Sequence, residues 1–152
     1  MDDLDSLAEQ LQQEMFTGYS ETAIEHARNP RNVGDIPDAD GYASVTGSCG
    51  DTMQIWLKVK HRKIERSTFW TDGCGSTIMA GSMVTEMARG RDIVAAFSIT
   101  QGDVLDALHG LPEDSVHCAL LAANTLKEAI KNYLACRNGE LCKGKYRANQ
   151  PG

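Results

Sequence analysis

Hydrophobic residues recur at steps of three and four along residues 3–16, which is the period of one face of a helix. These residues are Leu4, Leu7, Leu11 and Met15. The spacing predicts an amphipathic helix that ends near Gly18, because glycine commonly follows a helix C-terminus. A second, short helix is predicted from Ser20 to about residue 28, since the Asn-Pro pair at 29–30 disfavours helical geometry.

The hydrophobic pattern changes to strict alternation in residues 51–60, which is the pattern of a half-buried strand. Met53, Ile55, Leu57 and Val59 share one face of this segment. A polar turn at 60–63 leads to a partner strand at 64–71, and residues 42–46 form a weaker first strand. Short connections favour antiparallel pairing, so one small three-stranded antiparallel sheet is expected.

The period becomes helical again after Cys74. A helix capped by Ser76 and closed by Gly90 is expected, followed by short helices at 92–97 and 100–108 and a long last helix from 116 to about 134. Strands come first and most helices afterwards, an order typical of the α+β class. The expected fold therefore has helices on one face of the sheet, with the long C-terminal helix among them.

The composition indicates one globular domain. Of the 152 residues, 41% are hydrophobic and 24% are charged, and a chain of this size buries about 68–70% of its unfolded surface. No segment approaches the ~20 apolar residues that a membrane span requires. The first residues lack the features of a signal or transit peptide, so a cytoplasmic location without membrane contact is expected.

The net charge of −6 is concentrated at the N-terminus, where residues 1–16 contain five acidic side chains and no Lys or Arg. The nearly neutral remainder has no positive surplus for a phosphate backbone, which argues against nucleic-acid binding. We expect an acidic N-terminal helix extension (1–17), a main domain (18–136) and a short basic tail (137–152). The leucine stripe of the extension either packs on the main domain or docks on a partner or a second copy. Formation of a homodimer is therefore one of the alternatives.

Three of the five cysteines share features of a metal or redox site. Cys49 lies between Gly47 and Gly50, Cys74 lies between two further glycines, and Cys118 falls in the first turn of the last helix. Glycines allow the backbone to approach a ligand closely, and the positive end of a helix favours the thiolate at Cys74 and Cys118. An odd cysteine number in a reducing compartment argues against a disulfide framework.

Two further donors lie beside these cysteines in the sequence: Asp51 follows Cys49 by two residues, and His117 precedes Cys118. Cys136 and Cys142 lack flanking glycines and a nearby acid, so we expect neither to bind a metal.

The cysteine motifs resemble those of the IscU/NifU-type scaffolds for iron–sulfur cluster assembly. The matching segments are Gly-Ser-Cys-Gly-Asp at 47–51, Gly-Cys-Gly-Ser at 73–76 and His-Cys at 117–118. The resemblance extends to Tyr-Ser-Glu at 19–21 and Asn-Pro-Arg-Asn-Val-Gly at 29–34, and it covers about residues 19–134. It implies an IscU/SufE-like fold and a NifU N-terminal-like domain at 18–136.

The resemblance also implies a scaffold or carrier rather than an enzyme. Such a protein takes sulfur from a cysteine desulfurase and iron from a donor, builds a 2Fe–2S or 4Fe–4S cluster, and transfers it to apo-proteins. The implied ligands are Cys49, Cys74 and Cys118, with Asp51 or His117 in the fourth position, and Cys118 is the implied persulfide acceptor. Thiolates are the usual cluster ligands, and one weaker ligand among them suits a protein that releases its cluster.

The alternative is a zinc-dependent sulfurtransferase of the SufU type. Zinc accepts a tetrahedral set of Cys, Asp and His donors, so Cys49, Asp51 and Cys74 could hold zinc beside a persulfide on Cys118. The chain lacks the extra segment that SufU relatives carry between Cys74 and Cys118. Zinc is also a candidate metal ion for the cluster-free form. A purely structural zinc domain ranks last among the alternatives.

One position departs from the family pattern. The family usually has a lysine two residues before the His-Cys pair, and Ser115 occupies that position here. This departure removes the basis for expecting recognition by a dedicated Hsp70-type chaperone.

Overall fold

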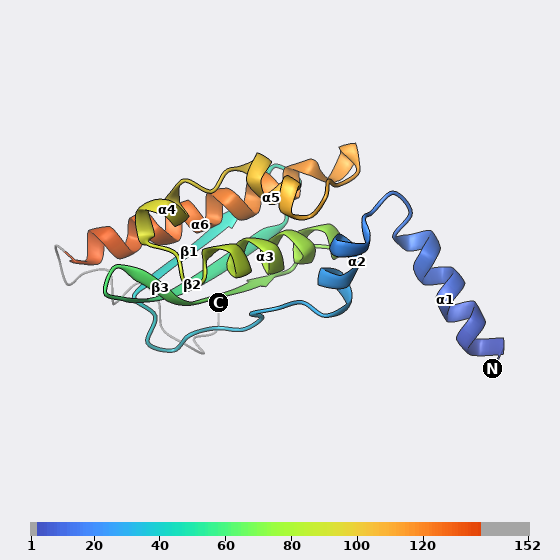
Figure 1. Ribbon diagram of the computed structural model, residues 1–152, viewed down its shortest axis with the longest axis horizontal. Helices are drawn as coiled ribbons and strands as arrows, with labels where there is room; N and C mark the ends of the chain where they lie inside the picture. Colours follow the sequence, from blue (N-terminus) through green and yellow to red (C-terminus); the bar gives the residue numbers. More distant parts are fainter. Residues whose placement is uncertain (1–2, 138–152) are drawn as a thin grey trace.

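Three antiparallel strands in the order β1–β2–β3 form the centre of the fold. They are β1 (Gly41–Thr46), β2 (Thr52–Lys60) and β3 (Lys63–Thr71). The computed structural model describes residues 3–137, with helices covering one face of the sheet (Figure 1). The expected α+β class and three-stranded antiparallel sheet are therefore confirmed.

The alternation in the central strand β2 determines which side chains enter the core. Met53, Ile55 and Leu57 are fully buried, as their shared face predicts. Val59 is only half-buried and packs against the same core, next to a register shift against β3 between Lys58 and Val59. On the other face the Trp56 ring contacts Tyr42 of β1, with ring centroids 5.4 Å apart.

Two long helices pack against the sheet: α3 (Gly75–Ala88) mainly on β3, and α6 (Val116–Arg137) on β1 and β2. Helix α2 (Glu21–Arg28) contacts α3, while α4 (Ile93–Phe97) and α5 (Gln101–Ala107) contact α6. A 3-10 turn, η1 (Glu113–Ser115), leads into α6. The hydrophobic core lies between these helices and the sheet, around Phe69, Met79, Val84, Leu126 and Ile130.

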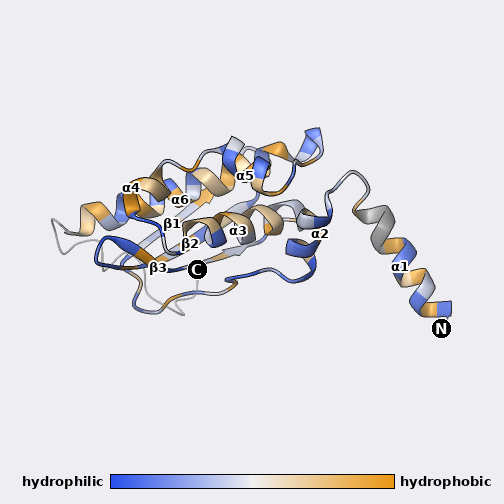
Figure 2. Cartoon of the chain, in the orientation of Figure 1, coloured by the Kyte–Doolittle hydropathy of each residue, from blue (hydrophilic) through white to orange (hydrophobic). Residues whose placement is uncertain are grey.

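Helix α1 (Asp3–Met15) extends away from this body, as Figure 1 shows. Its ribbon alternates between hydrophobic and hydrophilic positions in Figure 2, which agrees with the predicted amphipathic helix. Leu7 and Leu11 are each 51% exposed. The leucine stripe therefore does not pack on the body of its own chain.

The structure leaves two of the sequence predictions untested. The basic tail beyond Arg137, with Cys142, lies outside the described residues. Within residues 3–137, no helix is both long and apolar enough to cross a membrane. The cytoplasmic location remains a prediction.

Candidate functional site

The three cysteines singled out from the sequence lie at one end of the sheet. Cys49 lies in the turn between β1 and β2, Cys74 is the N-cap of α3, and Cys118 is in the first turn of α6. Thr46 pairs with Thr52, and Met53 pairs with Thr71, so the turn and the exit from β3 share this end. Cys49 and Cys74 are exposed, whereas Cys118 is only 2% exposed.

A single hydroxyl group, that of Thr77, connects the candidate donors. Thr77 Oγ1 donates a hydrogen bond to Asp51 Oδ2 at 2.8 Å. The same oxygen lies 3.5 Å from Cys118 Sγ and 4.0 Å from Cys74 Sγ. Thr77 is fully buried in the first turn of α3. It therefore joins side chains from three segments that are far apart in sequence.

The contact between Asp51 and Thr77 requires glycine at position 73. A Cβ atom on Gly73 would lie 2.6 Å from Asp51 Oδ2 and 2.7 Å from Thr77 Oγ1. Any side chain at this position would push the carboxylate and the hydroxyl apart. The glycine before Cys74 thus makes room for the Asp51 side chain.

Backbone hydrogen bonds hold the turn that carries Cys49 and Asp51. The Gly47 N–H donates to the Asp51 carbonyl at 2.8 Å, and the Gly50 N–H donates to the Gly47 carbonyl at 3.0 Å. Gly50 has a φ of 91°, which side-chain-bearing residues rarely adopt. The turn therefore needs Gly50 for its backbone conformation, while it leaves the Cys49 thiol exposed.

The ionisation of the Cys118 thiol depends mainly on its burial. Desolvation is the largest effect and raises the pKa of the Cys118 thiol, and the nearby Cys74, Cys49 and Asp51 raise it further. The hydrogen bond from Thr77 opposes them. Burial therefore disfavours the Cys118 thiolate in this arrangement.

His117 is placed beside Cys118 as the sequence suggested. Its Nε2 atom lies 3.7 Å from Cys118 Sγ, and its side chain is half-buried. The imidazole can therefore act either as a metal donor or as a hydrogen-bond partner of the thiol, and both roles stay open.

Ser76 does not cap α3, contrary to the sequence prediction. Cys74 occupies the N-cap position without a side-chain capping bond, and Ser76 lies inside the first turn. The Ser76 hydroxyl instead hydrogen-bonds to Tyr19 Oη and donates to Ser115 Oγ at 3.2 Å. Tyr19 Oη and Ser115 Oγ are also within hydrogen-bond distance, 3.0 Å apart. This network ties the segment after α1 to the N-termini of α3 and α6.

The donor set suits a thiolate-binding metal or cluster, although it is not arranged as a finished metal site. Among residues 3–137, no three or more His, Cys, Asp or Glu side chains are positioned together to hold a metal ion. Cys49, Cys74 and Asp51 are nevertheless near enough to influence the ionisation of Cys118. Binding would need small movements of side chains and of the exposed turn.

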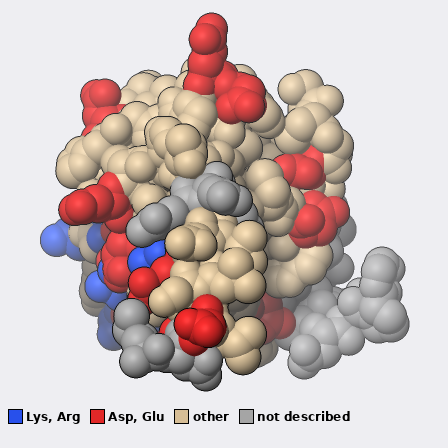
Figure 3. All heavy atoms as spheres, turned by 90° about the vertical axis from the view of Figure 1, so that its right-hand side faces the viewer, with Lys and Arg blue, Asp and Glu red and all other residues tan. Residues whose placement is uncertain are grey.

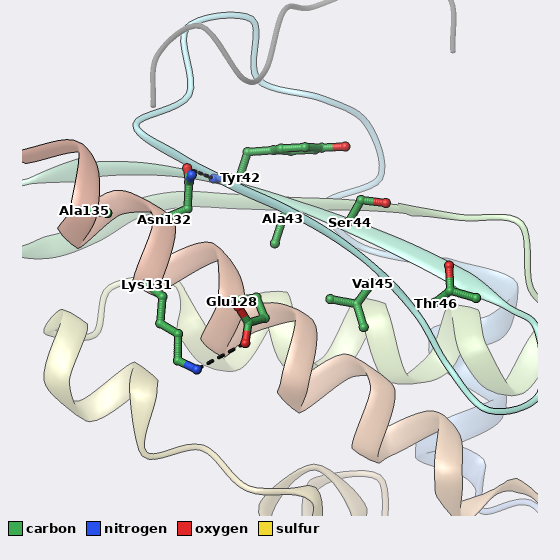
Figure 4. A pocket seen from close by; sticks show the side chains of 9 residues that line it. All are labelled: Tyr42, Ala43, Ser44, Val45, Thr46, Glu128, Lys131, Asn132 and Ala135. Atoms are coloured by element: carbon green, nitrogen blue, oxygen red, sulfur yellow. Dashed lines mark hydrogen bonds and ion pairs between the residues drawn. The ribbon is translucent and has the colours of Figure 1, made fainter. Parts of the chain in front are cut away.

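A cavity lies elsewhere, between β1 and α6 (Figure 4). Its volume is about 760 Å³, and none of its nine lining residues is a cysteine, aspartate or histidine. Cys136 is also remote from the site, about 27 Å along α6 from Cys118 at 1.5 Å per residue. Its Sγ atom contacts Asn132 Oδ1 at 3.8 Å.

Sequence reasoning found Cys49, Asp51, Cys74, His117 and Cys118 but missed Thr77. The available signal was its position three residues after Cys74, which places it on the same side of a helix. A spacing of three residues occurs throughout every helix, so only the contacts with Asp51 and Cys118 distinguish Thr77.

Known proteins share both the sequence and the fold. Residues 18–140 match the NifU-like N terminal domain family. The chain is 47% identical over 126 residues to iron-sulfur cluster assembly scaffold protein IscU 1 of Archaeoglobus fulgidus, covering 82% of each chain. It is 39% identical over 127 residues to IscU of Escherichia coli K12, covering 80% of this chain and 98% of the relative.

A solved structure agrees in fold. The N-terminal part of a NifU-like protein from Brucella abortus superposes with a TM-score of 0.59 at 18% identity, covering 76% of this chain and 94% of that one. At this identity the likeness concerns the fold alone. The family match and the close relatives together carry the assignment: the chain belongs to the NifU-like N-terminal domain family.

Proposed function

We propose that this protein is a scaffold on which an iron–sulfur cluster is assembled and from which it is transferred to apo-proteins. The observation that carries the proposal is the contact of Thr77 with Asp51 and Cys118, beside Cys74. It brings two thiols and a carboxylate from three segments together, and the exposed Cys49 lies in the turn that carries Asp51. The similarity to IscU proteins supports the same function.

The proposed ligands are Cys49, Cys74 and Cys118, with Asp51 or His117 as the fourth. Iron and sulfide are substrates that leave again as the cluster, so the protein is a carrier rather than a catalyst. Soft thiolates favour iron–sulfur clusters. An oxygen or imidazole ligand among them gives an incoming acceptor thiolate a position to replace.

Cys118 is the proposed sulfur acceptor. Its thiolate attacks the outer sulfur of a persulfide on a cysteine desulfurase; a new S–S bond forms at Cys118, the donor's S–S bond breaks, and the donor leaves as a thiolate. Because Cys118 is 2% exposed, this transfer requires a local movement that uncovers its sulfur.

Anaerobic reconstitution tests the proposal. The protein is incubated with ferrous iron, cysteine and a cysteine desulfurase, and visible absorption, iron and acid-labile sulfide are measured. We expect a coloured protein that contains both iron and sulfide and that passes the cluster to an apo-ferredoxin. A colourless protein that retains one zinc ion and no sulfide would overturn the scaffold function in favour of the SufU-type sulfurtransferase.

Matched serine variants make the experiment specific to the site. Cys49→Ser, Cys74→Ser and Cys118→Ser should each lose most of the reconstituted cluster. Cys136→Ser removes a thiol from the same long helix but outside the site, so it should retain the wild-type iron and sulfide content.

A further inference from the structure

Helix α1 presents an apolar stripe that the described residues of its own chain (3–137) leave exposed. Leu4, Leu7 and Leu11 are 70%, 51% and 51% exposed. Their spacing of i, i+3 and i+7 is the anchor pattern by which an amphipathic helix binds in a hydrophobic groove. Exposure of three leucines on one helix face costs hydration free energy, so this face is expected to be covered in an assembly.

A groove of matching character lies between α4 and the C-terminal half of α6. It has a volume of about 330 Å³. Val94, Phe97 and Leu134 line it and are 60%, 37% and 41% exposed. The two other apolar lining residues, Ile93 and Ile130, are buried and form its floor.

The charges of the helix and the groove are complementary. Described residues of α1 include Asp3, Asp5 and Glu9, and residues 1–16 contain no Lys or Arg. Three cations lie at the groove: Arg62 and Lys131 line it, and Lys127 Nζ lies 5.9 Å from the centre of the Phe97 ring.

Two acids partly offset these cations. Asp92 lies 4.0 Å from Arg62, and Glu128 lies 3.2 Å from Lys131. Both are exposed ion pairs, which contribute little to stability. Among these five side chains one positive charge remains in excess, opposite in sign to the helix, and it favours the approach of the helix.

The placement of the two surfaces favours a second copy as the occupant. In Figure 1 α1 leaves one end of the body, whereas α4 and the last turns of α6 lie at the other end. The segment after α1 is held at the first end by the contacts of Tyr19 with Ser76 and Ser115. Figure 3 shows Asp and Glu spread over the visible part of that end, with Lys and Arg at one side.

We propose that α1 of one copy docks in the α4–α6 groove of a second copy. The contact is heterologous, because each copy contributes a helix to one neighbour and a groove to another. Leu7 and Leu11 enter the groove against Val94, Phe97 and Leu134, and the acidic residues of α1 face Arg62 and Lys131. This inference does not depend on the proposed function.

A mixing experiment on the full chain tests this contact. The helix variant is Leu7→Glu/Leu11→Glu and the groove variant is Phe97→Glu; mass is measured by light scattering and sedimentation over a range of concentrations. We expect the wild type to associate as its concentration rises and each variant alone to associate about tenfold or more weakly. A mixture of both variants should form a 1:1 dimer and no larger species, since only one intact helix and one intact groove remain.

A control variant tests whether the loss of association is specific to the helix and the groove. Leu120→Glu changes another exposed leucine, 44% exposed on α6 and outside the groove, and should associate like the wild type. Because all substituted side chains are exposed, unchanged unfolding midpoints are expected and are checked first. A groove variant that still associates would show pairing between α1 helices, and a wild type that stays monomeric at all concentrations would show fold-back or another partner; either result overturns the proposal.

Discussion

Thr77 illustrates how the proposed site depends on single side chains outside the candidate ligands. Its hydroxyl contacts the Asp51 carboxylate and lies beside two cysteine sulfurs. Groups that hydrogen-bond to metal ligands orient them, and their removal typically weakens metal affinity by about 10–100-fold. We therefore expect Thr77 to position Asp51 in the proposed site.

Replacing Thr77 by the similarly shaped valine should weaken zinc binding by about tenfold. The substitution removes the hydrogen bond that holds Asp51 but retains the buried volume. Competition with a chromophoric zinc chelator measures the affinity. Thr77→Ser keeps the hydroxyl and should retain most of the affinity, whereas equal affinities in the valine variant and the wild type would contradict this role.

Asp51→Ala should slow cluster release. The carboxylate is the weaker ligand in the proposed set, so its loss removes the position at which an acceptor thiolate first enters. The rate is measured by following cluster transfer to apo-ferredoxin by circular dichroism. Asp72→Asn changes a nearby acid that accepts the Thr52 N–H and should transfer at the normal rate. A wild-type rate in Asp51→Ala would count against the assignment.

At the scale of elements, local signals located helix ends well where no tertiary contact competed. Thr100 and Asp103 form the capping box of α5, with the Asp103 N–H donating to Thr100 Oγ1 at 3.1 Å and the Thr100 N–H donating to Asp103 Oδ2 at 3.0 Å. At the start of α3 the same type of signal, Ser76, was misleading because Tyr19 and Ser115 engage its hydroxyl.

Thr100→Ala should lower the free energy of unfolding by about 1 kcal/mol. The change removes the side-chain bond to the Asp103 N–H at the exposed start of α5, which packs on α6 through its buried Val104. Urea titration monitored by circular dichroism measures the loss. Thr100→Ser preserves the oxygen and should be nearly neutral; an equal loss in both variants would contradict capping as the cause.

At the scale of the whole molecule, buried His26 couples stability to pH. Its Nδ1 lies 2.7 Å from Ser82 Oγ, and Ser82 Oγ accepts the Arg31 N–H at 2.9 Å. Burial is the largest cause of its lowered pKa, Arg31 lowers it further, and Glu86 and Glu25 oppose the shift. The folded protein therefore disfavours the protonated imidazole.

Stability should fall as the pH is lowered through about 6.5, the ordinary histidine value. Between that value and the lowered folded pKa, the unfolded chain binds more protons, so the free energy of unfolding decreases with decreasing pH. Urea titrations from pH 7.5 to 5 should show a flatter pH dependence in His26→Gln than in the wild type. An unchanged slope in His26→Gln would refute the coupling.

The sequence by itself determined the elements and the chemistry. The alternation around Ile55 and the helical spacing elsewhere reflect which faces must leave water, and that preference is local to each segment. Cys49, Cys74 and Cys118 were identified because their glycines and adjacent donors are neighbours in the chain. The family resemblance rested on those same short motifs.

Only the tertiary structure decided how these parts meet. The contact of Thr77 with Asp51 and Cys118 joins residues 26 and 41 positions apart, and no local pattern encodes such a pair. Burial raises the pKa of the Cys118 thiol, and that effect depends on what the fold packs around the side chain. The same holds for α1, whose stripe predicted a buried face but whose placement leaves it exposed.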